Sequence, residues 1–219
     1  MEHLQKGRIV FGISSFRGAY ILPPIMKQFD SLYPNVIVNI VEANSIALEE
    51  KILKGTLDLA LVALPLKKLN HDIEKLGLDE ILMVASQSHP VTAFLHKKDT
   101  FPYYWVDLKE AARFEFILSD YDTILGIKSR QEFKRTGLAV RARNTTITAE
   151  MAAARAGLGL SFTYRSCVGR WNEAVYASIG AQGIYAELGL AYPYADYRSK
   201  AALALGKMIR DFQKRITDS

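Results

Sequence analysis

The sequence has one cysteine, Cys167, among 219 residues, so no disulfide can form within the chain. It also has no long apolar run: the longest, LALVALPL at 59–66, is far shorter than the roughly 20 residues that cross a bilayer as a helix. The first residues, MEHLQKGR, contain no apolar stretch of the kind that a signal peptide needs. These absences predict a soluble, cytoplasmic protein that makes no contact with a membrane.

Strong charge of either sign is missing as well. The chain has 28 Lys and Arg against 23 Asp and Glu, and this modest excess is not concentrated in one block. The basic residues do not alternate with aromatic residues, as they do along a nucleic-acid-binding stripe. Since 49% of the residues are hydrophobic, we expect an ordinary globular chain with a substantial core and only a weak preference for anionic ligands.

Motifs for catalysis, nucleotide binding and metal binding are not found. No G-x-S-x-G surrounds Ser14, Ser15 or Ser161, and no G-x-x-x-x-G-K-[ST] phosphate loop occurs. The G-x-G at 157–159 follows a predicted helix and enters a predicted strand, which is the reverse of a dinucleotide loop. The four histidines have no metal-ligand spacing among themselves or with Cys167. The sequence therefore predicts no cofactor and no metal.

Adjacent acidic residues could serve as catalytic carboxylates, and two such pairs occur. They are Glu49-Glu50 and Asp79-Glu80. The simplest interpretation is that each pair is a solvated charge of a helix or loop. An enzyme would also need an acid, a base or a metal near its ligand, so this class receives little support.

The first part of the chain, residues 8–62, alternates between predicted strands and helices. Strands are predicted at 9–13, 36–41 and 57–64, because continuous apolar runs are typical of strands covered on both faces. A helix is predicted over 21–33 with Pro23 and Pro24 early in it, where a missing N–H costs little. A second helix is predicted over 47–54 and ends at Gly55, a residue suited to a left-handed cap.

The same alternation returns after the segment SQSHP at 86–90. The predicted elements are strand 114–118, helix 124–135, strand 138–143, helix 150–156 and strand 158–164. A further strand within 183–194 and a terminal helix over 199–216 follow. Short connections favour right-handed crossovers and parallel strands. We therefore expect two α/β units of similar size, with the chain leaving the first unit and later returning to it.

Hydroxyl and amide side chains gather where the predicted strands lead into helices. They are Ser14, Ser15, Asn44, Ser45, Asn144, Thr145, Thr146 and Thr148. In parallel α/β sheets such junctions lie at one edge, where backbone N–H groups and helix dipoles attract anions. One such residue could be no more than a helix cap, worth about 1 kcal/mol. Three junctions of this kind favour a ligand site, and a residue can have both roles.

The order and spacing of several motifs resemble the effector-binding domain of LysR-type transcriptional regulators. The family pattern is a strand and a variable polar loop, then L-P-x-x-x-x-F-x-x-x-Y-P-x-V, then L-x-x-G-x-L-D. The matching residues are Leu22-Pro23, Phe29, Tyr33-Pro34, Val36, LKGTLD at 53–58, Ser88-His89-Pro90 and AGLGL at 156–160. The resemblance covers nearly the whole chain.

This resemblance implies an α/β fold of two Rossmann-like lobes joined by two crossover segments, type II periplasmic-binding-protein-like, with a small effector between the lobes. Lobe I would comprise 1–84, completed by 191–219, and lobe II would comprise 85–190. The crossings would lie near 83–86 and 186–191. The helix-turn-helix domain of the family has no counterpart in these residues, so DNA would be contacted only through such a domain outside this chain.

The resemblance also implies the residues that contact the effector. They are Ser14, Ser15, Phe16, Asn44, Ser45, Ala63, Leu64, Thr145, Thr146 and Thr148, and Tyr121 could add a stacking wall. Ala63 and Leu64 stand where relatives often have a polar residue, so one polar contact is missing. Arg17, Arg143 and Arg165 are near enough in sequence to attract a carboxylate-bearing effector.

Two questions stay open at this level. A free-standing solute-binding protein would share the fold, and it is the main alternative to a regulatory domain of a bacterial transcription factor. Apolar positions in 22–33 and 124–133 are more numerous than one sheet-facing stripe requires, which predicts a homodimer or higher homo-oligomer. Alternatively, the additional apolar side chains lie in the core of their own lobe.

Overall fold

The computed structural model describes residues 7–69, 73–168, 174–194 and 198–217, with the side chains of 147–150 and 217 excepted. These residues form two compact units. Unit 1 comprises Met1–Leu78 and Glu187–Ser219, and unit 2 comprises Asp79–Ala186. The chain enters unit 2 within strand β4 (Ile73–Ser86) and returns within β11 (Ile184–Ala191). The units thus divide inside two long strands, a few residues before the lobe boundaries expected at 84/85 and 190/191.

Unit 1 contains a mixed sheet with the strand order β2-β1-β3-β11-β4. Strand β1 (Gly7–Ile13) pairs in parallel with β2 (Val36–Glu42) and β3 (Leu59–Ala63), and β11 is antiparallel to β3. The parallel alternation predicted for this part of the chain is therefore confirmed for β1, β2 and β3. The carboxyl ends of these three strands lie at one edge of the sheet, which we call the unit 1 edge.

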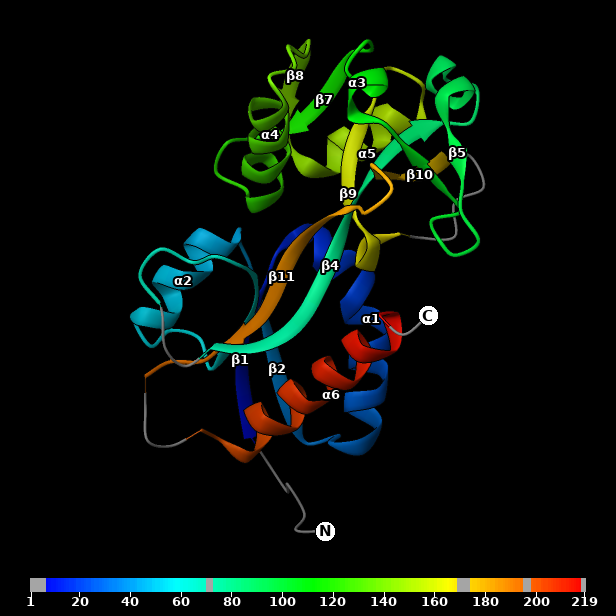
Figure 1. Ribbon diagram of the computed structural model, residues 1–219. Coiled ribbons are helices and arrows are strands. Elements are labelled where there is room, and N and C mark those ends of the chain that lie inside the picture. Colours follow the sequence, from blue (N-terminus) through cyan, green and yellow to red (C-terminus); the bar gives the residue numbers. More distant parts are fainter. Residues whose placement is uncertain (1–6, 70–72, 169–173, 195–197, 218–219) are drawn as a thin grey trace. The chain divides into compact units, whose positions relative to one another are not determined.

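Helices cover both faces of the unit 1 sheet (Figure 1). Leu59 and Leu61 of β3 belong to the core formed with α1 (Ser15–Leu32) and α6 (Lys200–Thr217). The alternate residues, Ala60 and Val62, belong to the core formed with α2 (Ser45–Leu53). Because successive side chains of a strand point to opposite faces, a continuous apolar run such as that of β3 requires a helix layer on each side.

Helix α1 begins earlier than predicted. It starts at Ser15, directly after its cap Ser14, so Pro23 and Pro24 lie inside the helix rather than near its first turn. Burial of Phe16, Arg17 and Gly18 favours helix in a segment that has few apolar residues. The prediction missed this first part because the periodic apolar signal starts only at Ile21.

The LKGTLD stretch forms the turn between α2 and β3. Gly55 has φ of +66°, the left-handed conformation predicted for it, and its N–H donates to the Ile52 carbonyl at 2.9 Å. Asp58 then accepts a hydrogen bond from the Val10 N–H at 2.7 Å, while its own N–H donates to the Val10 carbonyl at 2.9 Å. These contacts align the start of β3 with β1.

Unit 2 has parallel and antiparallel strand pairs, and one of its parallel pairs is visible beside helix α4 in Figure 1. The pair is β7 (Phe116–Ser119) and β8 (Ala142–Thr145), whose last residues, Ser119 and Thr145, are partners in the register. We call the carboxyl end of this pair the unit 2 edge. Strands β9 (Ser161–Tyr164) and β10 (Ala174–Ile179) are both antiparallel to β4.

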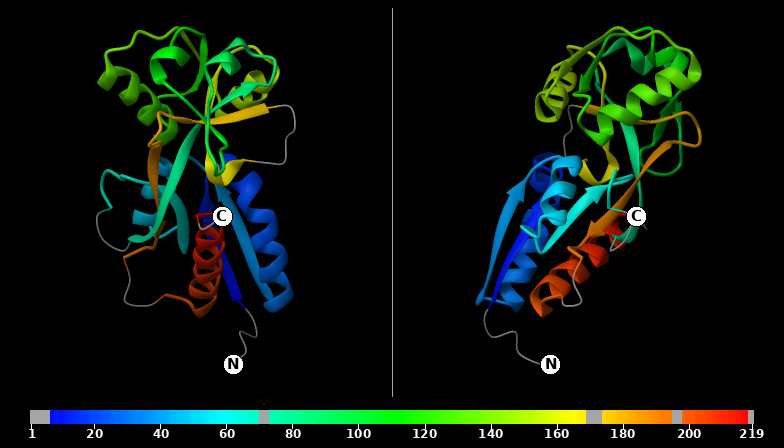
Figure 2. Two further views of the ribbon diagram at one scale, coloured as in Figure 1. Left: turned by 45° about the vertical axis from the view of Figure 1, so that its right-hand side comes forward. Right: turned by 90° about the vertical axis from the view of Figure 1, so that its left-hand side faces the viewer.

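The remaining elements of unit 2 are short or helical, and Figure 2 shows them from two further sides. They are η1 (Pro90–Phe94), β5 (His96–Lys97), β6 (Tyr104–Val106), α3 (Leu108–Ala111), α4 (Ile124–Thr136), α5 (Ile147–Arg155) and η2 (Arg165–Cys167). In the described residues of both units, no helix combines the length and the apolar character needed to cross a membrane.

Candidate functional site

The first junction of the unit 1 edge lies between β1 and α1. Ser14 caps α1, and its hydroxyl accepts a long hydrogen bond of 3.4 Å from the Arg17 N–H. Phe16 is 4% exposed and packs edge-on against Tyr20, with ring centroids 5.5 Å apart. Ser15 is exposed, and its hydroxyl makes no hydrogen bond to a described residue. Of the three predicted contacts here, Ser15 alone presents an unused hydroxyl at the surface.

The second and third junctions are tied to each other. Asn44 caps α2 by accepting a hydrogen bond from the Ala47 N–H at 2.9 Å. The buried Ser45 hydroxyl accepts from the Ala63 N–H, also at 2.9 Å, and the Leu64 N–H donates to the Glu187 carbonyl at 2.8 Å. The structure therefore brings Asn44, Ser45, Ala63 and Leu64 together, and the Ser45–Ala63 and Leu64–Glu187 hydrogen bonds are made within unit 1.

Glu49 extends this arrangement and was missed from the sequence. Its carboxylate is 1% exposed and accepts hydrogen bonds from three backbone N–H groups after β3, those of Lys67 at 3.2 Å, Lys68 at 2.5 Å and Leu69 at 2.7 Å. The prediction of a solvated charge is wrong for Glu49 and correct for the exposed Glu50. The carboxylate fixes the segment that follows Ala63 and Leu64.

The unit 2 edge carries the other predicted contacts. Thr145 is half-buried at the end of β8, and its hydroxyl makes no hydrogen bond to a described residue. Thr146 is exposed, and Tyr121 is 68% exposed in the loop between β7 and α4. Thr148 belongs to α5, but its side chain is outside the described residues.

Arg130 of α4 joins these parts of the unit 2 edge. Its Nη1 donates to the carbonyls of Ser119 at 2.6 Å and Gly126 at 2.9 Å, and its Nη2 donates to Oδ1 of Asn144 at 2.5 Å. Its guanidinium lies 4.0 Å from the ring centroid of Tyr121. The sequence prediction overlooked Arg130. Gly126 and Arg130 are four residues apart and therefore share one face of the helix, so the glycine leaves room there for the arginine side chain. That spacing could have pointed to Arg130.

Of the three arginines nominated from the sequence, one is buried and two contact other side chains. Arg17 is 3% exposed, and Arg165 lies over the Phe101 ring at 5.6 Å. Arg143 donates from Nε and Nη2 to the two carboxylate oxygens of Glu115, at 2.6 and 3.0 Å. This hydrogen-bonded ion pair lowers the pKa of Glu115 and raises the pKa of Arg143. Arg143 is therefore already neutralised by a carboxylate of the protein.

The acidic pair at the start of unit 2 is structural. Asp79, 2% exposed, accepts from the Ser166 N–H at 3.0 Å and the Ser166 hydroxyl at 2.6 Å. Glu80, 4% exposed, accepts from the Ser178 hydroxyl at 2.6 Å, and that hydroxyl accepts from Lys98 at 2.8 Å. The prediction of solvated charges is wrong here as well, because each carboxylate is buried and accepts hydrogen bonds from an element that is distant in the sequence, η2 for Asp79 and β10 for Glu80.

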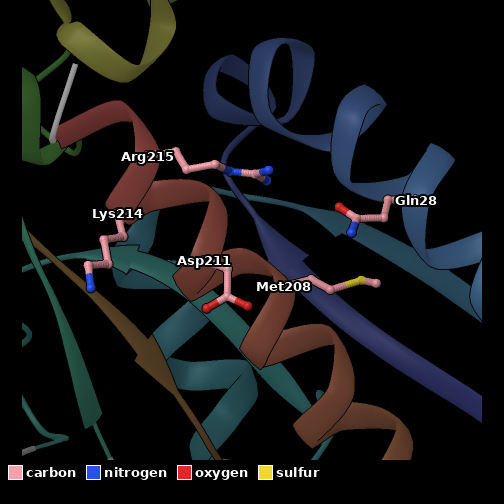
Figure 3. Close-up of a pocket in the computed structure, with 5 residues that line it drawn as sticks. All are labelled: Gln28, Met208, Asp211, Lys214 and Arg215. Atoms are coloured by element: carbon pink, nitrogen blue, oxygen red, sulfur yellow. The ribbon is translucent and has the colours of Figure 1, made fainter.

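Two surface pockets lie away from these edges. A pocket of 410 Å³ between α1 and α6 is lined by Gln28, Met208, Asp211, Lys214 and Arg215. Figure 3 shows Arg215 reaching toward α1 and Lys214 pointing away from it. A pocket of 310 Å³ in unit 2 is lined by Lys128, Gln131, Glu132, Arg135, Gly183, Ile184 and Tyr185. None of the predicted effector contacts lines either pocket.

Metal chemistry has no visible basis in the part of the chain that the structure describes. There, no group of three or more His, Cys, Asp and Glu side chains is arranged to hold a metal ion. Among the described residues, the two edges offer the hydroxyls of Ser15 and Thr145 and the guanidinium of Arg130, which suit the binding of a small polar or anionic molecule.

Comparison with known proteins identifies relatives along nearly the whole chain. The family model described as "LysR substrate binding domain" matches residues 2–214. A probable RuBisCO transcriptional regulator of Cyanidium caldarium is 25% identical over 211 residues, covering 92% of this chain and 64% of the relative. A protein of the same description from a Nostoc species is 24% identical over 217 residues, covering 95% and 63%. The chain thus spans a little under two thirds of the length of these relatives.

Solved structures share the fold at low sequence identity. The regulatory domain of CcmR from Synechocystis PCC6803, described in complex with 2-PG, has a TM-score of 0.80 at 16% identity and covers 95% of this chain and 98% of that one. The effector binding domain of BenM, described with its effector benzoate, has a TM-score of 0.77 at 17% identity, covering 97% and 95%. That of QuiR, described in complex with shikimate, has a TM-score of 0.75 at 18% identity, covering 96% and 98%. These likenesses confirm the predicted type II periplasmic-binding-protein-like fold.

Proposed function

The chain belongs to the LysR substrate binding domain family, and from this premise we propose that it is the ligand-sensing regulatory domain of a LysR-type transcriptional regulator. Its relatives are described as transcriptional regulators and not as enzymes. The same descriptions do not favour the alternative of a free-standing solute-binding protein. We further propose that the regulator acts in the cytoplasm.

We propose that the effector is a small molecule with a carboxylate or a similar anionic group, contacted by residues of both edges. The observation that supports this most directly is the set of polar groups left at the ends of parallel strands: the unused hydroxyls of Ser15 and Thr145 and the guanidinium of Arg130. Ser14, Phe16, Asn44, Ser45, Ala63, Leu64 and the other predicted residues would shape the surface around them. Benzoate, described as the effector of BenM, has the same carboxylate chemistry.

Calorimetric titration of the purified chain tests this proposal. The panel should contain metabolite carboxylates, including benzoate and shikimate, and phosphorylated carboxylates. Each is paired with an uncharged counterpart in which every anionic group is removed or replaced by an amide or ester. We expect at least one anion to bind and its uncharged counterpart to bind more weakly. Consistent preference for the uncharged compounds would contradict an anionic effector.

Control of transcription would require a second domain. A ligand can alter DNA binding only if it shifts an equilibrium of the whole protein that a DNA-binding domain senses, and the proposed helix-turn-helix lies outside this chain. We therefore expect the chain to bind its effector but to show only weak, salt-sensitive attraction to duplex DNA. Anisotropy titration with the regulator's own promoter and a scrambled control would test this. Sequence-specific binding at physiological salt would contradict it.

We also propose that the chain forms a homodimer. The exposed apolar residues that support it differ in part from the apolar positions in 22–33 and 124–133 that suggested it from the sequence. In α4 the apolar side chains of Ile124, Leu125 and Phe133 are buried, so α4 has little apolar surface to spare. In unit 1, Leu32 at the end of α1 is 58% exposed, and Ile37 of the edge strand β2 is 64% exposed. A second copy could cover these side chains. Sedimentation velocity at tens of micromolar should show a dimer, and a monomer there would contradict the proposal.

A further inference from the structure

Arg130 has hydrogen-bond donors to spare. A guanidinium has five N–H donors, and the contacts to Ser119, Gly126 and Asn144 use those of Nη1 and one of Nη2. The Nε–H and the second Nη2–H have no acceptor among the described residues. Paired N–H donors of a guanidinium suit the two oxygens of a carboxylate or phosphate.

The positive charge of Arg130 is also not neutralised within the described residues. All its acceptors are neutral carbonyl or amide oxygens, and it forms no ion pair with Asp120 or Asp122, which flank Tyr121 in the sequence. Two other arginines make an instructive contrast. Arg143 and Arg210 each use Nε and Nη2 to hold a glutamate, Glu115 and Glu74 respectively. In Arg130 the corresponding edge meets no described carboxylate.

The position of Arg130 is fixed by a glycine. A Cβ atom at Gly126 would clash with the Asp120 carbonyl oxygen, and it would lie 2.7 Å from the Ser119 carbonyl oxygen and 2.9 Å from Nη1 of Arg130. Only a residue without a side chain allows the loop and the guanidinium to approach α4 so closely. The Tyr121 ring packs on the guanidinium at 4.0 Å. A group held in this way loses little conformational entropy when it binds a ligand.

Resting on the proposed function, we propose that Arg130 determines the specificity of the site for anionic effectors. Its Nε–H and second Nη2–H bind two oxygens of a carboxylate or phosphate group, while its remaining donors hold Asn144 and the loop of Tyr121 in place. Thr145 lies at the same edge, at the end of β8, and pairs with Ser119 in the register. An amide in place of the anionic group has only one acceptor oxygen, so it cannot accept hydrogen bonds from both N–H groups equally. It also does not neutralise the positive charge of Arg130.

The test compares substitutions of Arg130 in the calorimetric titration. Arg130→Met should lower the affinity for the anion that binds the unmodified chain about 10- to 100-fold and that for its uncharged counterpart at most about threefold. Arg130→Lys keeps the charge but loses the paired donors, so its loss should be intermediate. Arg135→Met is the matched control, because Arg135 is on the same helix and pairs with Glu132 at 2.8 Å. It should bind like the unmodified chain.

A second readout reports on Arg130 directly. In a spectrum of arginine Nε–H groups, assigned with Arg130→Lys, the Arg130 resonance should shift when a binding anion from the panel is added. A shift of similar size with the amide counterpart, or equal losses for anion and amide in Arg130→Met, would overturn the inference and indicate a structural role. A third outcome is that the anion binds without shifting the Arg130 resonance and binds Arg130→Met with unchanged affinity. This outcome would overturn the inference about Arg130 but leave the proposed effector function intact. Failure of the whole panel to bind the unmodified chain would instead reject the anionic effector itself.

Discussion

The two edges differ in the side chains that fix the backbone around them, although both have capped helices. At the unit 1 edge, side-chain acceptors tie down backbone N–H groups: Ser45 accepts from Ala63, Asn44 from Ala47, and Glu49 from the segment after β3. At the unit 2 edge, a side-chain donor, Arg130, ties down backbone carbonyls. A buried carboxylate, Glu49, is thus among the groups that fix the unit 1 edge, whereas the unit 2 edge is held by a guanidinium that no described carboxylate neutralises. It follows that the preference for an anion should be set by unit 2.

The largest effect should come from removing the carboxylate of Glu49. Glu49→Ala leaves three backbone N–H groups near Leu69 without their acceptor, and we expect the free energy of unfolding to fall by about 3 kcal/mol. Denaturant unfolding measures this. Glu50→Ala is the matched control, since Glu50 is exposed, and should change the free energy by at most about 0.5 kcal/mol. Equal effects of the two substitutions would contradict the role assigned to Glu49.

A smaller loss should follow from Ser45→Ala. The substitution leaves the buried Ala63 N–H without an acceptor, which should lower the free energy of unfolding by about 2 kcal/mol. Ser31→Ala removes an exposed hydroxyl that donates to the Gln28 carbonyl and serves as the control, with an expected change within about 0.5 kcal/mol. If Ser45→Ala weakened effector binding without destabilising the chain, Ser45 would be a ligand contact rather than a link between α2 and β3.

The unused hydroxyls should affect binding instead of stability. Thr145→Val should weaken the affinity for the effector by about 1 kcal/mol, roughly fivefold, and leave the free energy of unfolding nearly unchanged, because Thr145 has no hydrogen-bond partner among the described residues. Ser15→Ala should act in the same way at the unit 1 edge. Calorimetry and denaturant unfolding on the same samples separate the two quantities. Loss of stability with unchanged affinity would leave each residue a structural role only.

The smallest effect concerns the pH dependence of unit 2. His89 caps η1 by accepting the Val91 N–H on Nδ1 at 3.1 Å, and burial lowers the pKa of this imidazole. Because the folded-state pKa is below the unfolded value, the unfolded chain binds more protons, and stability should fall as the pH drops below about 6.5. His89→Asn keeps a capping acceptor that does not titrate. The difference in free energy of unfolding between His89→Asn and the unmodified chain should therefore change in favour of His89→Asn as the pH is lowered from about 7 to about 5.

Hydrogen exchange can show whether the loss of stability at low pH is located near His89. Exchange in the η1 region of the unmodified chain should increase on acidification more than exchange at the unit 1 edge. The same change in His89→Asn would show that another group is responsible.

Elements with a continuous or periodic apolar pattern were predictable, and those with a mixed pattern were not. Strand β3, all of it buried, and helix α4 were both identified from their patterns. Strand β4 was missed because its first half, IEKLGL, carries charges and a glycine and is only partly buried, although it continues directly into the buried second half. Whether such a segment becomes a strand depends on neighbours such as β11, which is far away in the sequence.

Local sequence was enough to identify the junctions where strands lead into helices, and therefore which polar residues, among them Ser15 and Thr145, lie near the two edges, but it did not fix the first residue of α1 or the last residue of β8. Hydrophobic periodicity and capping residues act over a few positions, so they can be read locally. Which of these polar groups remain available was settled by tertiary contacts. Glu49 meets its donors eighteen to twenty residues later, and Arg130 meets Asn144 fourteen residues later. A hydrogen bond requires two groups within about 3 Å of each other, and for residues far apart in the chain that distance is set by folding.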